Sequence, residues 1–91
     1  KHIILGMMSN KNHVEYINYF KDKISSLTTV DIPNQPNAIN GEDLMKKLKN
    51  LKNVNYKKSI KEAINSIDLK DNDIIIITGS LYLAGEALNL N

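Results

Sequence analysis

Hydrophobic positions along this chain follow two different spacings. Short runs rich in apolar and β-branched residues occur at residues 3–8, 27–32 and 73–78, and each predicts a strand. The third run contains an unbroken row of isoleucines, Ile74–Ile77. Such a row is typical of a strand that is buried on both faces of a parallel sheet. A further, short strand is expected at residues 53–56.

Between these runs, apolar residues recur every three or four positions, which is the spacing of an amphipathic helix. Helices are expected at about residues 13–25, around Leu44, Leu48 and Leu51, along Ile60–Ile67, and at about residues 80–90. Asn12 and Asn40 stand where their side chains can cap the first two helices. Alternating strands and helices favour parallel pairing, with helices on both faces of the sheet. The sequence thus predicts an α/β fold, a three-layer, Rossmann-like sandwich with a mostly parallel sheet in a single small domain over residues 1–91.

Composition narrows the classes of function. All 12 basic residues are lysines, and the formal net charge is only +2. The lack of arginine argues against a dedicated nucleic-acid reader, because such proteins favour arginine for contacts to bases and phosphates. The lack of cysteine excludes disulfides, zinc–thiolate sites and thiol nucleophiles, and no apolar run approaches the length of a membrane span. We therefore expect a monomeric, cytoplasmic protein that binds neither nucleic acid nor a membrane.

The best candidate for a binding site is the turn at Gly79 and Ser80, between the last strand and the last helical pattern. Free backbone N–H groups and the positive end of a helix dipole meet at such a corner, at the edge of the sheet where α/β proteins bind ligands. Gly79 permits a close backbone approach, and Ser80 can either cap its own helix or bind a ligand oxygen. The local pattern alone favours the cap. Lys11, in the loop after the first strand, is placed at the same edge to contact an anionic substrate, although a solvated turn lysine is the simpler interpretation.

Other polar residues predict no chemistry, so we assign no catalytic and no metal-binding residue. His2 and His13 lack the spacing of a metal pair, and His13 is expected to be exposed in a first helical turn. The acidic residues between the third helix and the last strand lack the glycine and glutamate of a calcium loop, and we expect a solvated connection there. These acids are Asp68, Asp71 and Asp73. Near the end of the chain, the residues expected in the core are Tyr82, Leu83 and Leu88.

Several segments, in this order along the chain, resemble the C-terminal domain of folylpolyglutamate synthases, which belong to the Mur ligase superfamily. The segments are Ile3–Met8 followed by Asn10-Lys11-Asn12, then Pro36-Asn37-Ala38 with Glu42-Asp43-Leu44, and finally Ile77–Leu83. The resemblance covers nearly the whole chain, and the stretch from Thr78 to Leu83 is its most specific part.

This resemblance implies a reaction. Enzymes of the family use ATP and magnesium to form an acyl phosphate on a folate-linked carboxylate, which the amine of glutamate then attacks. The implied partners are glutamate and a folate or dihydropteroate acceptor. ATP and magnesium would be cofactors of a parent enzyme and would not be bound by this chain alone, because the phosphate-binding loop lies in another domain of the family. The C-terminal domain closes over the nucleotide and helps to place glutamate, and Ser80 would then contact the glutamate carboxylate.

The chain also departs from the family pattern. Asn10 and Asn12 stand where the family has two acids, so only Lys11 of that motif is kept, and Asn37 replaces a usual arginine. Because the chain begins at Lys1 inside a strand pattern, we expect it to be a fragment of a longer enzyme. It lacks the P-loop and the magnesium ligands of the family, so we expect it to be inactive alone. Two alternatives stay open: the C-terminal domain of another Mur-type ligase with a different acceptor, such as a peptidoglycan precursor, and a stand-alone, non-catalytic α/β binding module.

Overall fold

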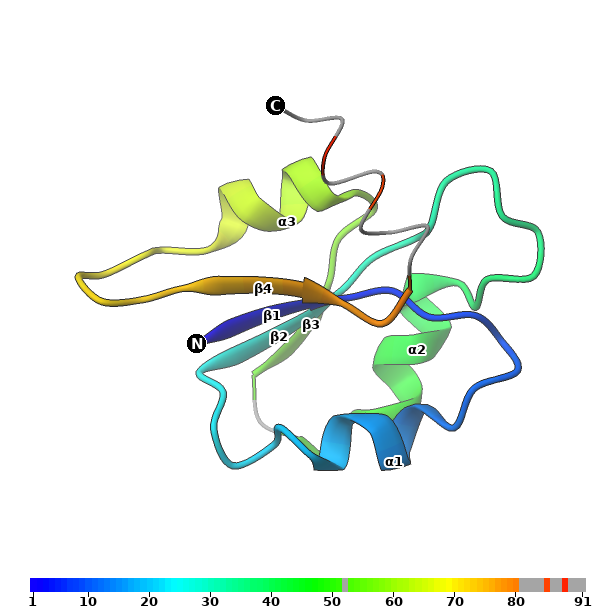
Figure 1. Ribbon diagram of the computed structural model, residues 1–91, viewed down its shortest axis with the longest axis horizontal. Coiled ribbons are helices and arrows are strands. Elements are labelled where there is room, and N and C mark those ends of the chain that lie inside the picture. Colours follow the sequence, from blue (N-terminus) through cyan, green and yellow to red (C-terminus); the bar gives the residue numbers. More distant parts are fainter. Residues whose placement is uncertain (52, 81–84, 86–87, 89–91) are drawn as a thin grey trace.

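A parallel sheet forms the centre of the computed structural model, which describes residues 1–51, 53–80, 85 and 88. Within these residues the sheet has four strands, and their order is β3-β2-β1-β4 (Figure 1). The strands are β1 His2–Leu5, β2 Ser26–Thr29, β3 Val54–Tyr56 and β4 Ile75–Thr78. Each neighbouring pair is parallel. The short strand expected near residues 53–56 is therefore confirmed, as is the parallel sheet.

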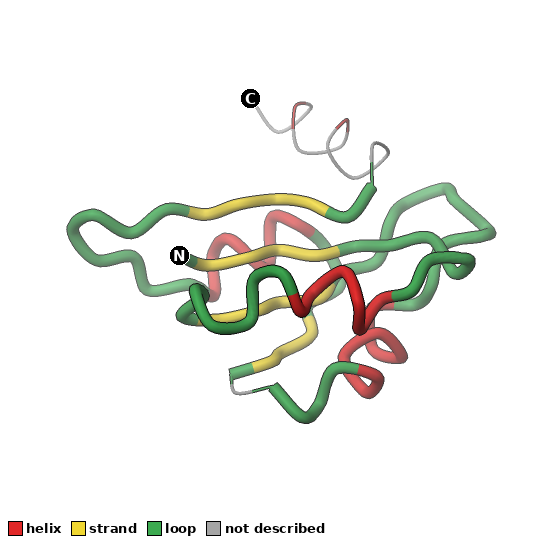
Figure 2. The backbone as a smooth tube through the Cα atoms, turned by 60° about the horizontal axis from the view of Figure 1, so that its bottom comes forward, coloured by secondary structure: helices red, strands yellow, loops and turns green. Residues whose placement is uncertain are grey.

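Three helices in the described part of the chain begin at polar caps. They are α1 His13–Asn18, α2 Gly41–Lys47 and α3 Ile60–Ser66. The side chains of Asn12, Asn40 and Ser59 each accept a hydrogen bond from a backbone N–H group of the first turn. Helices α1 and α2 cover one face of the sheet and α3 covers the other, as Figures 1 and 2 show. This arrangement confirms the predicted three-layer sandwich. No helix in the described ranges has the length and apolar character needed to cross a membrane.

Two apolar clusters hold these layers together, one on each face. Successive side chains of a strand point to opposite faces, so Ile3 and Leu5 join the cluster under α1 and α2, whereas Ile4 joins the cluster under α3. The first cluster also contains Met7, Ile17, Leu27, Leu44 and Leu48. The second contains Val30, Ile32, Ile60 and Ala63. Strand β1 is thus buried on both faces.

The isoleucine row was expected to be buried on both faces of the sheet, and this holds only in part. Ile76 packs against the first cluster, and Ile75 and Ile77 pack against the second, but all three are only half-buried. Strand β4 lies beside β1 at the edge of the described sheet. Ile74 is 48% exposed, whereas Ile3 and Ile4 of β1 are completely buried. The two segments have almost the same apolar character, so their composition could not tell which would take the central position.

Most elements are shorter than predicted. Helix α1 ends at Asn18, where a helix to about residue 25 was expected, and α2 ends at Lys47. Strand β1 ends at Leu5 because Gly6, Met7 and Met8 leave the sheet, and Met8 forms an isolated bridge with Ala38. Apolar spacing records which side of a segment faces the core, and it continues through such irregular turns.

The end of the chain falls largely outside the described residues. The helix expected at residues 80–90 lies there, as do Tyr82 and Leu83. Leu88 is described and is 72% exposed, so its prediction as a core residue is wrong. Helical spacing marks a side of a helix as apolar, but it does not ensure that another element covers that side.

Candidate functional site

The loops at the carboxyl ends of the strands are tied together by backbone hydrogen bonds. The Gly6 N–H donates to the Thr78 carbonyl at 3.3 Å, which joins the loop after β1 to the end of β4. The Ser9 N–H donates to the Asn37 carbonyl at 2.8 Å, and the Ile39 N–H donates to the Met7 carbonyl at 3.0 Å. Ligands of open α/β sheets bind at this edge, so these loops form the candidate site.

At Gly79 the backbone approaches this loop so closely that no other residue fits. Its φ is +107°, in the region that favours glycine. A Cβ atom at this position would lie 2.5 Å from the carbonyl oxygen of Gly6 and 2.8 Å from Cδ1 of Leu5. Gly79 thus packs closely on the loop after β1, and its role in binding a substrate stays a prediction. Ser80 follows directly and is half-buried, so the turn presents Ser80 at the carboxyl edge.

A contact that the sequence analysis missed lies directly beside this turn. The hydroxyl of Tyr16, on α1, lies 2.6 Å from Oγ1 of Thr78, the last residue of β4. Tyr16 packs against the cluster under α1 and α2. A tyrosine on the apolar side of a helix is a signal for such a bond, because a buried hydroxyl usually finds a partner.

Lys11 is exposed on the loop between β1 and α1. Its backbone N–H donates to the Met8 carbonyl at 3.3 Å, which folds the loop into a turn. The loop borders the Gly79 turn through Gly6, and Lys11 adds a cation to it. Its role as a contact to an anionic substrate stays a prediction.

The neighbouring His13 was expected to be exposed, and this prediction is wrong. Its exposed fraction is 6%, and its Nε2 donates to the Met8 carbonyl at 3.1 Å. The imidazole thus closes the turn that carries Lys11. Position in a first helical turn suggested exposure, but the loop before α1 folds back over this residue.

The side-chain amide of Asn12 makes two hydrogen bonds to Glu15 at the start of α1. Its Oδ1 accepts from the backbone N–H of Glu15 at 3.1 Å, and its Nδ2 donates to Oε2 of Glu15 at 3.1 Å. An aspartate could make the first bond, but it would place a second carboxylate against that of Glu15. The replacement of an acid of the family motif by Asn12 therefore suits the local sequence.

A second set of residues at this edge was also missed. Asp31, two residues beyond β2, accepts from the Gly41 N–H at 2.7 Å and from the Tyr56 hydroxyl at 2.7 Å. The bond to the Asp31 carboxylate, together with burial and nearby negative charge, raises the pKa of Tyr56 to about 12. A Cβ atom on Gly41 would lie 2.6 Å from the Tyr56 ring. Asp31 therefore fixes the start of α2 against β3, and an acid just after a strand was the signal available.

Asp31 also borders an open cavity of about 380 Å³ between the loop after β2 and the start of α3. The cavity is lined by Asp31, Pro33, Lys58, Ser59 and Glu62. Both oxygens of Asp31 are already occupied by Gly41 and Tyr56, so this carboxylate acts in holding the fold.

Comparison with known proteins gives the family of the chain. The family model described as "Mur ligase, glutamate ligase domain" matches residues 1–81. The chain belongs to this family. No curated protein matches this glutamate ligase domain.

Solved structures of two folylpolyglutamate synthases share the fold of this domain. The enzyme from Mycobacterium tuberculosis, solved in complex with ADP and AMPPCP, is 21% identical with a TM-score of 0.84. The enzyme from Thermotoga maritima is 22% identical with a TM-score of 0.82. Both matches cover 98% of this chain, but only 23% and 20% of the two enzymes. The ligase domain thus spans less than a quarter of their length.

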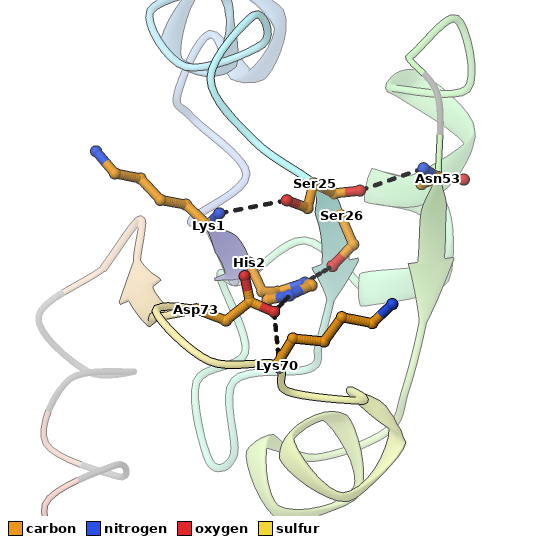
Figure 3. A network of polar contacts seen from close by, with 7 residues as sticks. All are labelled: Lys1, His2, Ser25, Ser26, Asn53, Lys70 and Asp73. Atoms are coloured by element: carbon orange, nitrogen blue, oxygen red, sulfur yellow. Dashed lines mark hydrogen bonds and ion pairs between the residues drawn. The ribbon is translucent and has the colours of Figure 1, made fainter.

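The opposite edge of the sheet carries a separate network of polar contacts (Figure 3). His2, at the start of β1, lies between Ser26 and Asp73: its Nδ1 is 2.7 Å from Oγ of Ser26, and its Nε2 is 3.3 Å from Oδ2 of Asp73. The Lys70 N–H also donates to Oδ2 of Asp73, at 2.9 Å. The hydrogen bond from the Lys70 N–H is the main cause that lowers the pKa of Asp73 below its usual value, and the contact with His2 is the next.

The position of Asp73 in this network corrects one expectation, and His2 is in the network whereas His13 is not. Asp73 was expected in a solvated connection, but it joins the start of β4 to β1 through His2. Asp68 and Asp71 are exposed, as expected. His2 and His13 lie at opposite ends of the β1 segment, because His2 begins β1 and His13 bonds to the loop that follows it.

Proposed function

We propose that this chain is the C-terminal domain of an ATP-dependent ligase that adds glutamate to folate. The reaction would form an amide bond through an acyl phosphate, and this domain would help to close the nucleotide site and to place glutamate. The observation that carries the proposal is the family match over residues 1–81, which ends at the Gly79 and Ser80 turn on the carboxyl edge of the sheet. The acceptor and the activity belong to a longer parent enzyme.

Within this proposal, Ser80 contacts the glutamate carboxylate. The close packing of Gly79 on Gly6 supports this role, because it gives the turn a defined path beside the loop of Lys11. A hydroxyl and backbone N–H groups are suitable donors to a carboxylate. The ammonium group of Lys11 adds a positive charge that favours the approach of an anion.

ATP and magnesium would be held mainly by other parts of the parent enzyme. The chain contains neither a P-loop nor a G-x-G-x-x-G sequence. Among the described residues, no group of three or more acids or histidines is placed to hold a metal ion. Within the proposal, the residues of this chain therefore act on glutamate and on domain closure. We also expect the protein to be a monomer of the cytoplasm.

A second candidate is a Mur-type ligase with a different acceptor. It is favoured by Asn10 and Asn37, which replace an acid and a usual arginine of the folate enzymes. Both residues are exposed on the loops of the carboxyl edge. The glutamate site of this domain would be unchanged in that case.

The test is an amide-formation assay on the full-length protein with ATP, magnesium, glutamate and a reduced folate. We expect ADP release that depends on both substrates, and a product heavier by one glutamate residue in the mass spectrum. The 91 residues alone should give no product. Product from these residues alone would contradict the proposal, and turnover of another acceptor but not of folate would favour the second candidate.

A further inference from the structure

The turn that carries Ser80 is held on its β1 side by the backbone. Thr78 pairs in register with Leu5, and its carbonyl accepts from the Gly6 N–H. Gly79 then packs against the Gly6 carbonyl. These contacts fix the distance between the turn and the loop after β1.

The other anchor comes from a side chain on α1. Tyr16 is half-buried, its ring contacts that of Phe20 at a centroid distance of 5.6 Å, and its hydroxyl lies 2.6 Å from Oγ1 of Thr78. This O–H···O distance is at the short end of the usual range. The bond joins residues 62 positions apart, and it connects the first helix to the last described strand.

The bond between Tyr16 and Thr78 lies one residue before Gly79 and two before Ser80. Gly79 has no side chain and is conformationally permissive, so it cannot by itself direct Ser80. The contacts of Thr78, the residue before it, therefore contribute to the direction of the turn. Thr78 is held by its backbone on one side and by Tyr16 on the other.

We propose that Tyr16 is a positioning residue for glutamate: through Thr78 it holds the Gly79 and Ser80 turn in the orientation that receives the carboxylate. This inference rests on the proposed function. Tyr16 does not touch the substrate. Its hydroxyl acts on binding only through Thr78.

The experiment compares Tyr16→Phe with Tyr19→Phe in the full-length protein. Tyr19 follows α1 and is 74% exposed, so the second variant makes the same chemical change away from the turn. Loss of the bond in Tyr16→Phe should raise the KM for glutamate about 3- to 10-fold, the effect of one neutral hydrogen bond. The KM for ATP and kcat should stay near the wild-type values, and Tyr19→Phe should change none of these constants.

Variants of the partner complete a double-mutant cycle. Thr78→Val should raise the KM for glutamate as Tyr16→Phe does, and the double variant should add little further. Thr78→Ser keeps the hydroxyl and should restore most of the affinity. A lower melting temperature with an unchanged KM for glutamate would make the bond a packing contact only and would overturn the inference.

A measurement without catalysis separates this inference from the proposed function. In ¹H–¹⁵N spectra of the full-length protein, Tyr16→Phe should shift the amide signals of Gly79 and Ser80, and Tyr19→Phe should leave them in place. Unshifted signals in Tyr16→Phe would contradict the positioning role. If Tyr16→Phe shifts these signals but glutamate neither shifts them nor reacts, the proposed function fails while the control of the turn by Tyr16 stands.

Discussion

Ser59 and Ser80 offer two serine substitutions for comparison, one at a helix cap and one at the proposed contact to glutamate. Ser59 caps α3 by accepting from the Glu62 N–H at 3.2 Å. Ser80 follows the glycine that packs on the loop after β1, at the edge where ligands of this fold class bind. Only Ser80 is expected to act on glutamate.

Ser80→Ala should weaken the binding of glutamate in the full-length enzyme. Loss of one hydrogen bond to a charged group costs about 1.5–3 kcal/mol, which corresponds to a rise in the KM for glutamate of about 10- to 100-fold. The KM for ATP should change little, because the proposal assigns Ser80 to glutamate alone. Steady-state kinetics measure both constants.

Ser59→Ala is the matched control for this variant. It should lower the free energy of unfolding by about 1 kcal/mol through loss of the cap, with no change in either constant. Thermal melts of both variants complete the comparison. An unchanged KM for glutamate in Ser80→Ala, together with a lower melting temperature, would leave Ser80 with a structural role only.

At the scale of single elements, β4 is held at its start by Asp73. The carboxylate of Asp73 accepts from the Lys70 N–H and contacts His2 of β1. These contacts lie at the amino edge, at the other end of β4 from the Gly79 turn. A change at Asp73 should therefore affect stability without affecting the binding of glutamate.

Asp73→Asn should remove a pH-dependent part of the stability. The pKa of Asp73 is lower in the folded protein than its usual value, so the folded state favours the carboxylate. Its contribution is present above the unfolded pKa of about 3.9 and is lost as the pH falls through the lower, folded pKa. Melting temperatures of wild type and variant should differ at neutral pH and converge in acid.

Asp71→Asn is the control, because Asp71 is exposed in the same connection. Its melting curve should follow that of the wild type across the whole range. A constant difference between Asp73→Asn and the wild type, independent of pH, would show that the carboxylate charge is not what stabilises the start of β4.

The contrast between β1 and β4 predicts different costs for one substitution. Ile3→Ala removes a completely buried side chain from β1 and should lower the free energy of unfolding by about 2–5 kcal/mol. Ile74→Ala makes the same change just before β4, at a side chain that is 48% exposed. Its cost should stay within about 0.5 kcal/mol, as for most surface changes. Equal losses in denaturant titrations would mean that Ile74 is as buried as Ile3.

At the scale of the whole molecule, the proposed glutamate site and the His2 network lie at opposite edges of the sheet. The carboxyl edge brings together the loops after β1, β2 and β4, with Lys11, Asn37 and Ser80 on them. The amino edge holds the His2 network, which joins β4 to β1 and β2. Strand β1 reaches both edges. Its first residue, His2, lies in the network at the amino edge, and Gly6, which follows β1, packs against Gly79 at the carboxyl edge.

The sequence by itself determined the elements and their class. The spacing of apolar residues is a property of short segments, so it placed the starts of four strands and three helices within a few residues of their positions. The alternation of the two periods determined a parallel sheet with helices on both faces, since few other arrangements bury both kinds of segment. Gly79 could be assigned to a close approach because glycine is the residue that allows one.

Tertiary structure alone decided the order of the strands and the contacts between distant segments. β1 and β4 have nearly equal apolar character, and only the packing of whole layers places β1 in the centre. The burial of His13 depends on a loop that folds back over it. The bond between Tyr16 and Thr78 depends on two elements that meet only in the folded chain, 62 residues apart. Local patterns record which side of a segment is apolar, but which partner covers that side is decided by the whole fold.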